Sequence, residues 1–347
     1  QEEPHKRRVR YKGKYPKNYK EKYKELNPEK YQDTIEKVIR KGSTPAGMHI
    51  SIMVKEIIDF LQIKPGQTGF DATLGYGGHT RAMLECLKGQ GHMYATDVDP
   101  IESAKTKKRL AEAGFGEDIL TIKLQNFCTI DEIAKEAGGF DFVLADLGVS
   151  SMQIDNPDRG FSFKVDGPLD LRLNPEKGIS AAERLAGIGE EELAGMLWEN
   201  SDEPYAEELA HAIVTEIKHG KPIETTTRLR EVIEETLSFL PEKERKDTVK
   251  KTCQRTFQAL RIDVNNEFEV LYEFMEKLPG ALKPGGRAAI LTFHSGEDKL
   301  VKKALKQGYK EGIYSEIAND VVRPSAEECA QNGRARSTKM RWAVRAE

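Results

Sequence analysis

Short apolar runs alternate with amphipathic stretches in the first half of the chain. Compact apolar runs occupy residues 68–72, 91–96 and 141–145. The third run contains four consecutive apolar residues, which is typical of a strand buried on both faces of a parallel sheet. Residues 50–61 and 82–87 instead repeat their apolar positions at helical spacing. Strands that alternate with helices predict an α/β fold built on a doubly wound sheet.

One helical pattern follows another between residues 155 and 261. Apolar residues recur there every four positions, as at Leu209, Ile213 and Ile217. Strand patterns return at 287–293 and 339–344, after a helix at 268–278 and a turn at 283–286. A helical block between two parts of one sheet pattern indicates an insertion. We therefore predict an extension at 1–47, a discontinuous α/β domain at 48–154 and 262–347, and a helical insertion at 155–261.

The charge of the chain is unevenly distributed. Residues 1–47 carry 14 Lys and Arg against 7 Asp and Glu, a net charge of +7, although the whole chain has a net charge of −3. The remainder is therefore acidic. A basic segment on an acidic body favours an anionic partner for that segment, and a solvated tail is the alternative.

The cysteine pattern and the hydropathy narrow the class of protein further. The four cysteines are scattered, with no pair at the spacing of a zinc site or a disulfide framework. We expect reduced thiols, no metal and a cytoplasmic protein. Because no apolar run approaches the roughly 18–20 residues of a membrane span, we expect no membrane association.

A glycine-rich loop follows the first predicted strand. Its sequence from Asp71 to Thr80 is Asp-Ala-Thr-Leu-Gly-Tyr-Gly-Gly-His-Thr, with glycines at 75, 77 and 78. Glycines in such a loop let a ligand approach the backbone closely, next to the free N–H groups at a helix amino terminus. Asp97 closes the next strand, where a carboxylate can accept hydrogen bonds from both ribose hydroxyls. The pattern predicts a nucleoside-containing cofactor.

Two residues favour S-adenosylmethionine as that cofactor. The dinucleotide fingerprint has a third glycine where this chain has Thr80. The carboxylate of Asp71 is unfavourable beside a pyrophosphate, but it suits a cofactor whose amino-acid part carries an ammonium group. A nicotinamide enzyme and a purely structural glycine turn are the alternatives.

Four later segments add to the loop: residues 146–153, residues 158–163 with 167–172, residues 257–262 with 264–265, and residues 293–298. Together with the loop, and in this order, they resemble the bacterial small-subunit ribosomal RNA cytosine-N4 methyltransferases. The resemblance covers roughly residues 48–347. It implies a Rossmann-like class I methyltransferase sheet with an inserted helical domain for RNA recognition. It also implies methylation of a cytosine N4 amine in the decoding region, with small-subunit ribosomal RNA or the assembled small subunit as partner.

The resemblance also implies a set of cofactor contacts. They are Gly77, Gly78, His79, Asp97, Phe127, Asp146 and Gln153, to which the loop itself adds Asp71 and Gly75. Phe127 could lie against the adenine, and Asp146 ends a strand at the edge where open α/β sheets bind ligands. For His79, a helix-capping side chain is the alternative.

Methylation of a cytosine amine requires an acceptor near the N–H, because the nitrogen lone pair is delocalised into the ring. Many amino-methyltransferases use an Asp/Asn-Pro-Pro-aromatic motif, where this chain has Asp146-Leu147-Gly148-Val149. Asp146 is the first candidate for positioning the amine. His294, after a predicted strand, is the second candidate catalytic residue, and a strand-end histidine with satisfied hydrogen bonds is its alternative.

Two further groups could contact RNA. Arg159, Phe161 and Phe163 could hold an extruded base, with core packing of the two phenylalanines as the alternative. A basic run could contact phosphates or form a solvated edge strand, and it comprises Arg334, Arg336, Lys339 and Arg341.

The chain departs from the family pattern in three places. Residues 1–47 have no counterpart in its common form, Gly296 replaces a Leu, and the segment 201–205 replaces a Gly-Glu-Glu segment followed by arginines. Two other functions therefore stay open: a methyltransferase for another RNA site, and a ribosome-assembly factor that retains the fold without catalysis.

Overall fold

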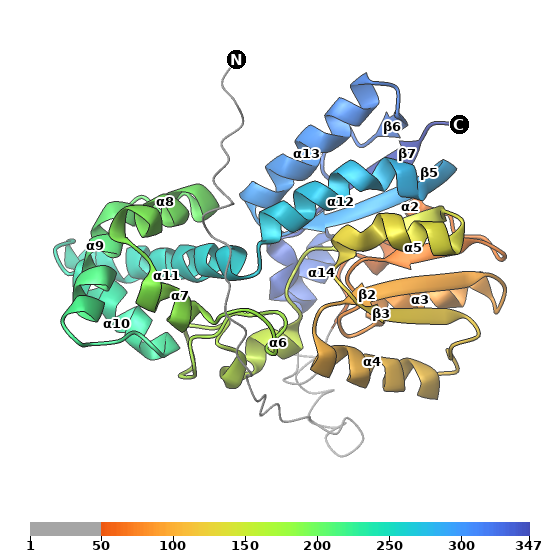
Figure 1. Ribbon diagram of the computed structural model, residues 1–347. Helices are drawn as coiled ribbons and strands as arrows, with labels where there is room; N and C mark the ends of the chain where they lie inside the picture. The colour runs from red at the N-terminus through yellow and green to blue at the C-terminus, as the bar shows by residue number, and fades with distance from the viewer. Residues whose placement is uncertain (1–49) are drawn as a thin grey trace. The chain divides into compact units, whose positions relative to one another are not determined.

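The computed structural model describes residues 50–347 and divides them into two compact units (Figure 1). One unit is helical and comprises residues 153–269. The other contains the sheet and comprises residues 50–152 and 270–347. The expected extension at 1–47 lies outside the described residues. The expected insertion ended at 261, whereas the helical unit continues to 269 because its longest helix, α11 (Glu242–Val264), runs past that position.

Seven strands form a single sheet in the second unit. In spatial order they are β3 (Leu120–Leu124), β2 (His92–Asp97), β1 (Thr68–Asp71), β4 (Phe140–Asp146), β5 (Leu282–Thr292), β7 (Lys339–Arg345) and β6 (Tyr314–Ile317). The first five are parallel, and β7 is antiparallel to both of its neighbours. This arrangement confirms the doubly wound α/β prediction. The strand order reverses between β1 and β4, which is where open α/β sheets bind ligands.

Successive residues of β4 explain why its sequence is continuously apolar. Phe142 and Leu144 belong to one buried cluster, whereas Val143 and Ala145 belong to another. Because side chains alternate between the two faces of a strand, both faces of β4 are covered. The helices of this unit are α2 (Val54–Leu61), α3 (Gly78–Leu87), α4 (Pro100–Glu112), α5 (Ile130–Ala137), α12 (Glu267–Ala281), α13 (Ser295–Lys310) and α14 (Ala326–Gln331).

The turn expected at residues 283–286 is part of β5 instead. The register between β4 and β5 shifts between Phe140 and Phe142, and Gly285 has a positive φ of 77°. A local irregularity therefore accommodates the Pro-Gly-Gly sequence without ending the strand. No helix within residues 50–347 is both long and apolar enough to cross a membrane.

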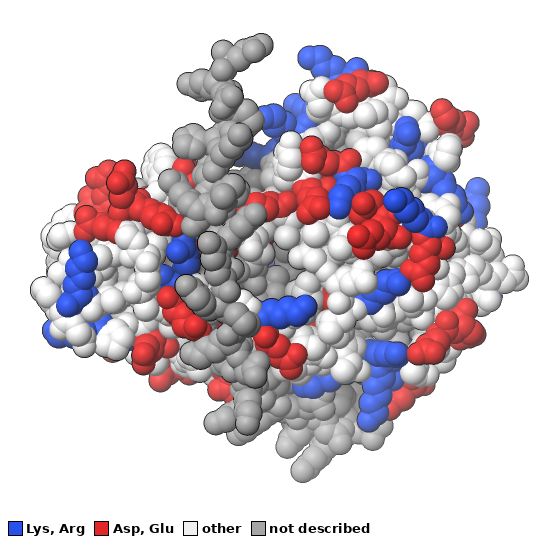
Figure 2. All heavy atoms as spheres, viewed as in Figure 1, with Lys and Arg blue, Asp and Glu red and all other residues white. Residues whose placement is uncertain are grey.

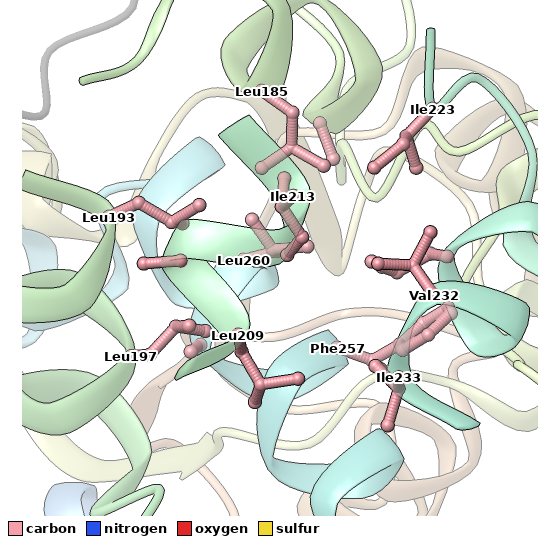
Figure 3. Packing of buried hydrophobic residues seen from close by; sticks show 14 of the residues in the cluster. Leu185, Leu193, Leu197, Leu209, Ile213, Ile223, Val232, Ile233, Phe257 and Leu260 are labelled. Carbon is pink, nitrogen blue, oxygen red and sulfur yellow. The ribbon is translucent and has the colours of Figure 1, made fainter. Parts of the chain in front are cut away.

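The helical unit has its own hydrophobic core (Figure 3). Besides α11, its helices are α6 (Ser151–Asp155), α7 (Ala181–Gly187), α8 (Glu190–Ser201), α9 (Ala206–Lys218) and α10 (Thr226–Thr236). Leu209 and Ile213 of α9 are fully buried and Ile217 packs at the margin, which confirms the helical spacing. Figure 3 shows Leu209 and Ile213 among buried side chains of the neighbouring helices, such as Leu193, Val232 and Leu260.

The proposed base-holding group contributes to this core. Arg159 is buried, and its Nη2 donates hydrogen bonds to the carbonyl oxygens of Arg172 at 3.2 Å and Leu173 at 2.8 Å. The Phe163 ring packs against Phe257 with centroids 5.7 Å apart. Phe161 and Phe163 are both partly buried against this core, as the core-packing alternative expected.

Candidate active site

Three aspartates lie at the carboxyl edge of the sheet. Asp71, Asp97 and Asp146 are the last residues of β1, β2 and β4. These strands are parallel neighbours, and β1 and β4 flank the reversal in strand order. The structure thus brings together carboxylates that are 75 residues apart in the sequence, at the edge where a ligand is expected.

The three glycines of the loop are favoured for different physical reasons. A Cβ on Gly77 would lie 2.7 Å from the Thr106 side chain, and one on Gly78 would lie 1.8 Å from the Ser51 Oγ. Gly75 has a φ of 50°, and a Cβ there would meet nothing closer than a backbone oxygen at 3.9 Å. The backbone conformation favours glycine at Gly75 and at Gly77, whose φ is 90°, whereas at Gly78 the close approach of Ser51 is the reason.

Helix α4 holds the loop in place. Thr106 donates a hydrogen bond to the Gly75 carbonyl. Arg109 donates to the Tyr76 carbonyl at 3.2 Å and lies over the Tyr76 ring at 3.9 Å. Sequence reasoning missed both residues, because nothing in the pattern of α4 shows which of its polar side chains face the loop. Their contacts preorganise the backbone that a cofactor would meet.

Asp97 has oxygen lone pairs suited to ribose. Its Oδ2 accepts a hydrogen bond from the Gly75 N–H at 3.2 Å, and its Oδ1 accepts one from the Asp99 N–H at 3.0 Å. Burial raises the pKa of Asp97 to about 7, and the nearby carboxylates of Asp99 and Glu102 add to this increase. Each oxygen retains a second lone pair, so two ribose hydroxyls fit the residue and would stabilise its ionised form.

Asp71 is fully buried and braces the loop. Thr80 donates from its Oγ1 to Asp71 Oδ2 at 2.6 Å, and the Thr73 N–H donates to Oδ1 at 3.0 Å. Burial raises the pKa of Asp71 despite these donors. The hydrogen bonds explain the residue as a structural support, and its contact with the ammonium group of the cofactor stays a prediction. Thr80, where a dinucleotide enzyme would have glycine, is required as the partner of Asp71.

Asp146 is contacted by the loop after β1, by its own turn and by His79. Its N–H donates to Thr73 Oγ1 at 2.7 Å, and its Oδ1 accepts the Gly148 N–H at 3.3 Å. Its Oδ2 lies 3.5 Å from His79 Nδ1. Burial raises the pKa of Asp146; a positive charge on His79 opposes this effect, and the carboxylates of Asp71 and Glu297 reinforce it. A raised pKa is typical of a group that exchanges protons.

His79 does not cap helix α3. The N-cap is Gly77, which makes no side-chain cap, whereas the His79 side chain is buried with Nε2 2.7 Å from the Ile52 carbonyl oxygen. The helix-capping alternative is therefore wrong.

His294 is the residue that caps a helix. It is the N-cap of α13, and its Nδ1 accepts the Glu297 N–H at 3.4 Å. Its Nε2 lies 3.2 Å from Glu297 Oε2. The Nδ1 contact fits the alternative of a hydrogen-bonded strand-end histidine, and a catalytic role for His294 stays a prediction. Glu297, which sequence reasoning did not single out, is instead close enough to Asp146 to influence its charge.

The two remaining predicted contacts lie in different units. Phe127 begins a short 3-10 turn after β3, is half-buried, and meets Phe274 edge-on at 5.2 Å. Its contact with an adenine stays a prediction. Gln153 is buried in α6, where the helical unit begins.

The basic run near the carboxyl terminus is not a continuous phosphate-binding strip: Arg341 is buried, Arg334 is half-buried and Arg336 is exposed. Arg341 is buried and pairs with Asp298, and Lys339 Nζ lies 3.9 Å from the same carboxylate. Their strand β7 is internal, between β5 and β6. Both the phosphate role of Arg341 and the solvated edge strand were therefore wrong.

Comparison with known proteins assigns the chain to a family. The model of the MraW methylase family matches residues 46–346. The chain belongs to this family. A relative from Agathobacter rectalis, "Ribosomal RNA small subunit methyltransferase H 1", is 84% identical over 347 residues, which cover 100% of this chain and 99% of the relative. "Ribosomal RNA small subunit methyltransferase H" of Thioalkalivibrio sulfidiphilus is 38% identical over 320 residues, which cover 87% of this chain and 98% of the relative.

Family membership confirms the methyltransferase class and S-adenosylmethionine as the cofactor, and it removes the nicotinamide alternative.

Among solved structures, the chain is similar to an rRNA methylase from Streptococcus thermophilus. The match covers 85% of this chain and 94% of that protein, with 12% identity and a TM-score of 0.38. The strand order and the family match, rather than this superposition, carry the fold assignment. The family model begins at residue 46, so nearly all of the basic extension lies outside it, although the Agathobacter relative aligns with the whole chain.

Proposed function

We propose that this protein transfers a methyl group from S-adenosylmethionine to the N4 amine of a cytosine in small-subunit ribosomal RNA. The observation that carries the proposal is the 84% identity, over the whole chain, to a protein named for methylation of that RNA. The three aspartates at the carboxyl edge of the sheet supply the matching chemistry. Such a substrate would place the protein in the cytoplasm.

The residues of the site divide the task between binding and positioning. When bound, S-adenosylmethionine supplies a methyl group on a positively charged sulfur. Asp97 would accept the ribose hydroxyls, Phe127 would lie against the adenine, and the backbone from Gly75 to Gly78 would line the cofactor. Asp146 would accept a hydrogen bond from the cytosine amine, which orients the nitrogen lone pair and places an acceptor where the proton must leave.

The helical unit is proposed to recognise RNA through one helix rather than through its overall charge. Residues 153–269 contain 16 Lys and Arg against 25 Asp and Glu, a net charge of −9. Figure 2 shows acidic side chains gathered over the end of this unit that carries α8. Exposed lysines on one face of α11 are the exception, at Lys243, Lys246 and Lys250. This row is the part of the unit best suited to phosphates.

Nucleoside mapping tests the target atom. Small-subunit RNA from cells with and without the protein is digested and analysed by mass spectrometry, and we expect N4-methylcytidine to disappear from the latter. Persistence of that nucleoside with loss of another methylated one would favour a different RNA site. Unchanged methylation with defective subunit assembly would favour an assembly factor. Transfer of labelled methyl to naked RNA and to assembled subunits, side by side, identifies the substrate form.

A further inference from the structure

The His79 ring has both of its nitrogens next to an oxygen atom. Nε2 lies 2.7 Å from the Ile52 carbonyl oxygen, and Nδ1 lies 3.5 Å from Asp146 Oδ2. A backbone carbonyl can only accept a hydrogen bond, so Nε2 must carry a proton. This contact therefore sets the tautomer of the ring, as a hydrogen bond to one nitrogen generally does.

Because Nε2 carries a proton, the neutral His79 ring has no proton on Nδ1, the nitrogen that faces Asp146. If Nδ1 were unprotonated and Asp146 ionised, two acceptor lone pairs would face each other without a hydrogen. Both side chains are largely withdrawn from water, with 7% exposure for His79 and 16% for Asp146. Water therefore screens the repulsion poorly. One additional proton between Nδ1 and Oδ2 removes the conflict, whichever of the two atoms carries it.

The surrounding charges favour retention of this proton. Asp71, at the end of β1, and Glu297, on α13, are the other carboxylates that act on Asp146. Both are buried. Glu297 accepts the N–H groups of Phe293 and His294, and Asp71 accepts the Thr73 N–H and the Thr80 hydroxyl. A proton shared by His79 and Asp146 thus reduces the negative charge of a crowded site.

We propose that His79 is a positioning residue that shares one proton with Asp146 and thereby fixes the carboxylate for the substrate amine. The inference rests on the proposed function and extends it. His79 Nδ1 lies 3.5 Å from Oδ2, and the Gly148 N–H donates to Oδ1 at 3.3 Å. Because the protein contacts both oxygens, fewer orientations of Asp146 are open when it accepts the amine N–H.

Two substitutions at one position separate this role from simple packing. An asparagine amide occupies the place of Nδ1, so His79→Asn retains a donor towards Asp146. A glutamine amide reaches the place of Nε2, so His79→Gln retains the Ile52 contact and loses that donor. We expect the kcat of His79→Gln to lie roughly tenfold or more below that of His79→Asn, because only His79→Asn retains a donor towards Asp146. We also expect His79→Asn to lose the decline in kcat that proton loss from the pair causes at alkaline pH.

Magnetic resonance tests the proton directly and does not depend on the RNA substrate. The full chain is labelled with ¹⁵N-histidine and ¹³C-aspartate, and the signals that His79→Gln and Asp146→Asn remove assign the two groups. We expect Nδ1 or the Asp146 carboxyl to be protonated at neutral pH, and both to change together on titration. An unprotonated Nδ1 beside an ionised Asp146 overturns the proposal, even if methyl transfer is confirmed. Equal kcat in the two His79 variants overturns the positioning role. Failure of the proposed function alone would leave the resonance result unchanged.

Discussion

Arg341 donates two hydrogen bonds to Asp298, from Nε at 2.8 Å and from Nη2 at 2.9 Å. The pair joins the internal strand β7 to the first turn of α13, and Thr292 at the end of β5 donates to the same carboxylate at 2.9 Å. These donors keep the pKa of Asp298 below its usual value although burial opposes them. The pair therefore ties together three elements next to the site, and its guanidinium is not available to a phosphate.

Replacing Arg341 should cost stability rather than RNA affinity. Arg341→Met leaves a buried carboxylate without its main partner, so the free energy of unfolding should fall by about 3 kcal/mol. Urea denaturation measures this change, and Lys302→Met on the exposed face of α13 is the control. The double variant with Asp298→Asn should lose less than the single one. Unchanged stability together with weakened RNA binding would restore the phosphate role.

Cofactor binding should weaken in mildly acidic solution. The pKa of Asp97 is about 7 in the protein without cofactor, and only the ionised carboxylate can accept both ribose hydroxyls. As the pH falls through 7 the binding-competent fraction decreases, so the Kd should rise by about tenfold per pH unit well below that value. Calorimetry across this range should show the slope. Asp97→Asn should bind more weakly and lose the slope, and an unchanged pH profile in this variant would exclude Asp97 as its source.

The sequence predicts the site residues at the ends of strands, but it does not predict the contacts between residues far apart in the chain. Asp71, Asp97 and Asp146 each follow an apolar strand pattern, and parallel strands bring their carboxyl ends to one edge. The contact between Thr73 and Asp146 spans 73 residues, and no local pattern shows which threonine faces which strand. Arg341 looked like part of an exposed basic run because its partner lies 43 residues away.

The two strands absent from the sequence prediction are both edge strands. β3 reads Leu-Thr-Ile-Lys-Leu and β6 reads Tyr-Ser-Glu-Ile, and each lies at one end of the sheet with partly exposed positions. Only strands covered on both faces have the continuous apolar runs that made β4 recognisable. The hydropathy pattern therefore could not predict the two edge strands of the sheet.

Gly78 should be required for packing rather than for cofactor approach. A Cβ at this position would lie 1.8 Å from Ser51 Oγ and 3.1 Å from Ser51 Cβ. Gly78→Ala should therefore lower the free energy of unfolding by about 1–3 kcal/mol through overpacking. In a Ser51→Gly background the clash is gone, and the same change should be neutral or stabilising by up to about 1 kcal/mol because alanine favours helix. The four proteins form a double-mutant cycle by urea denaturation. Additive effects would show that Ser51 is not the obstacle.

The lysine row on α11 should contribute salt-dependent RNA affinity. Lys246 and Lys250 are exposed and four residues apart, in a unit whose net charge is −9. Changing both to Glu replaces two phosphate partners with repulsive charges, so affinity for small-subunit RNA should fall and the salt slope should decrease by about 2. The matched control reverses Lys302 and Lys303 on α13, which are equally exposed. The Kd for S-adenosylmethionine should not change in either variant. Equal losses of RNA affinity in both would mean that net charge, rather than a surface on α11, determines binding.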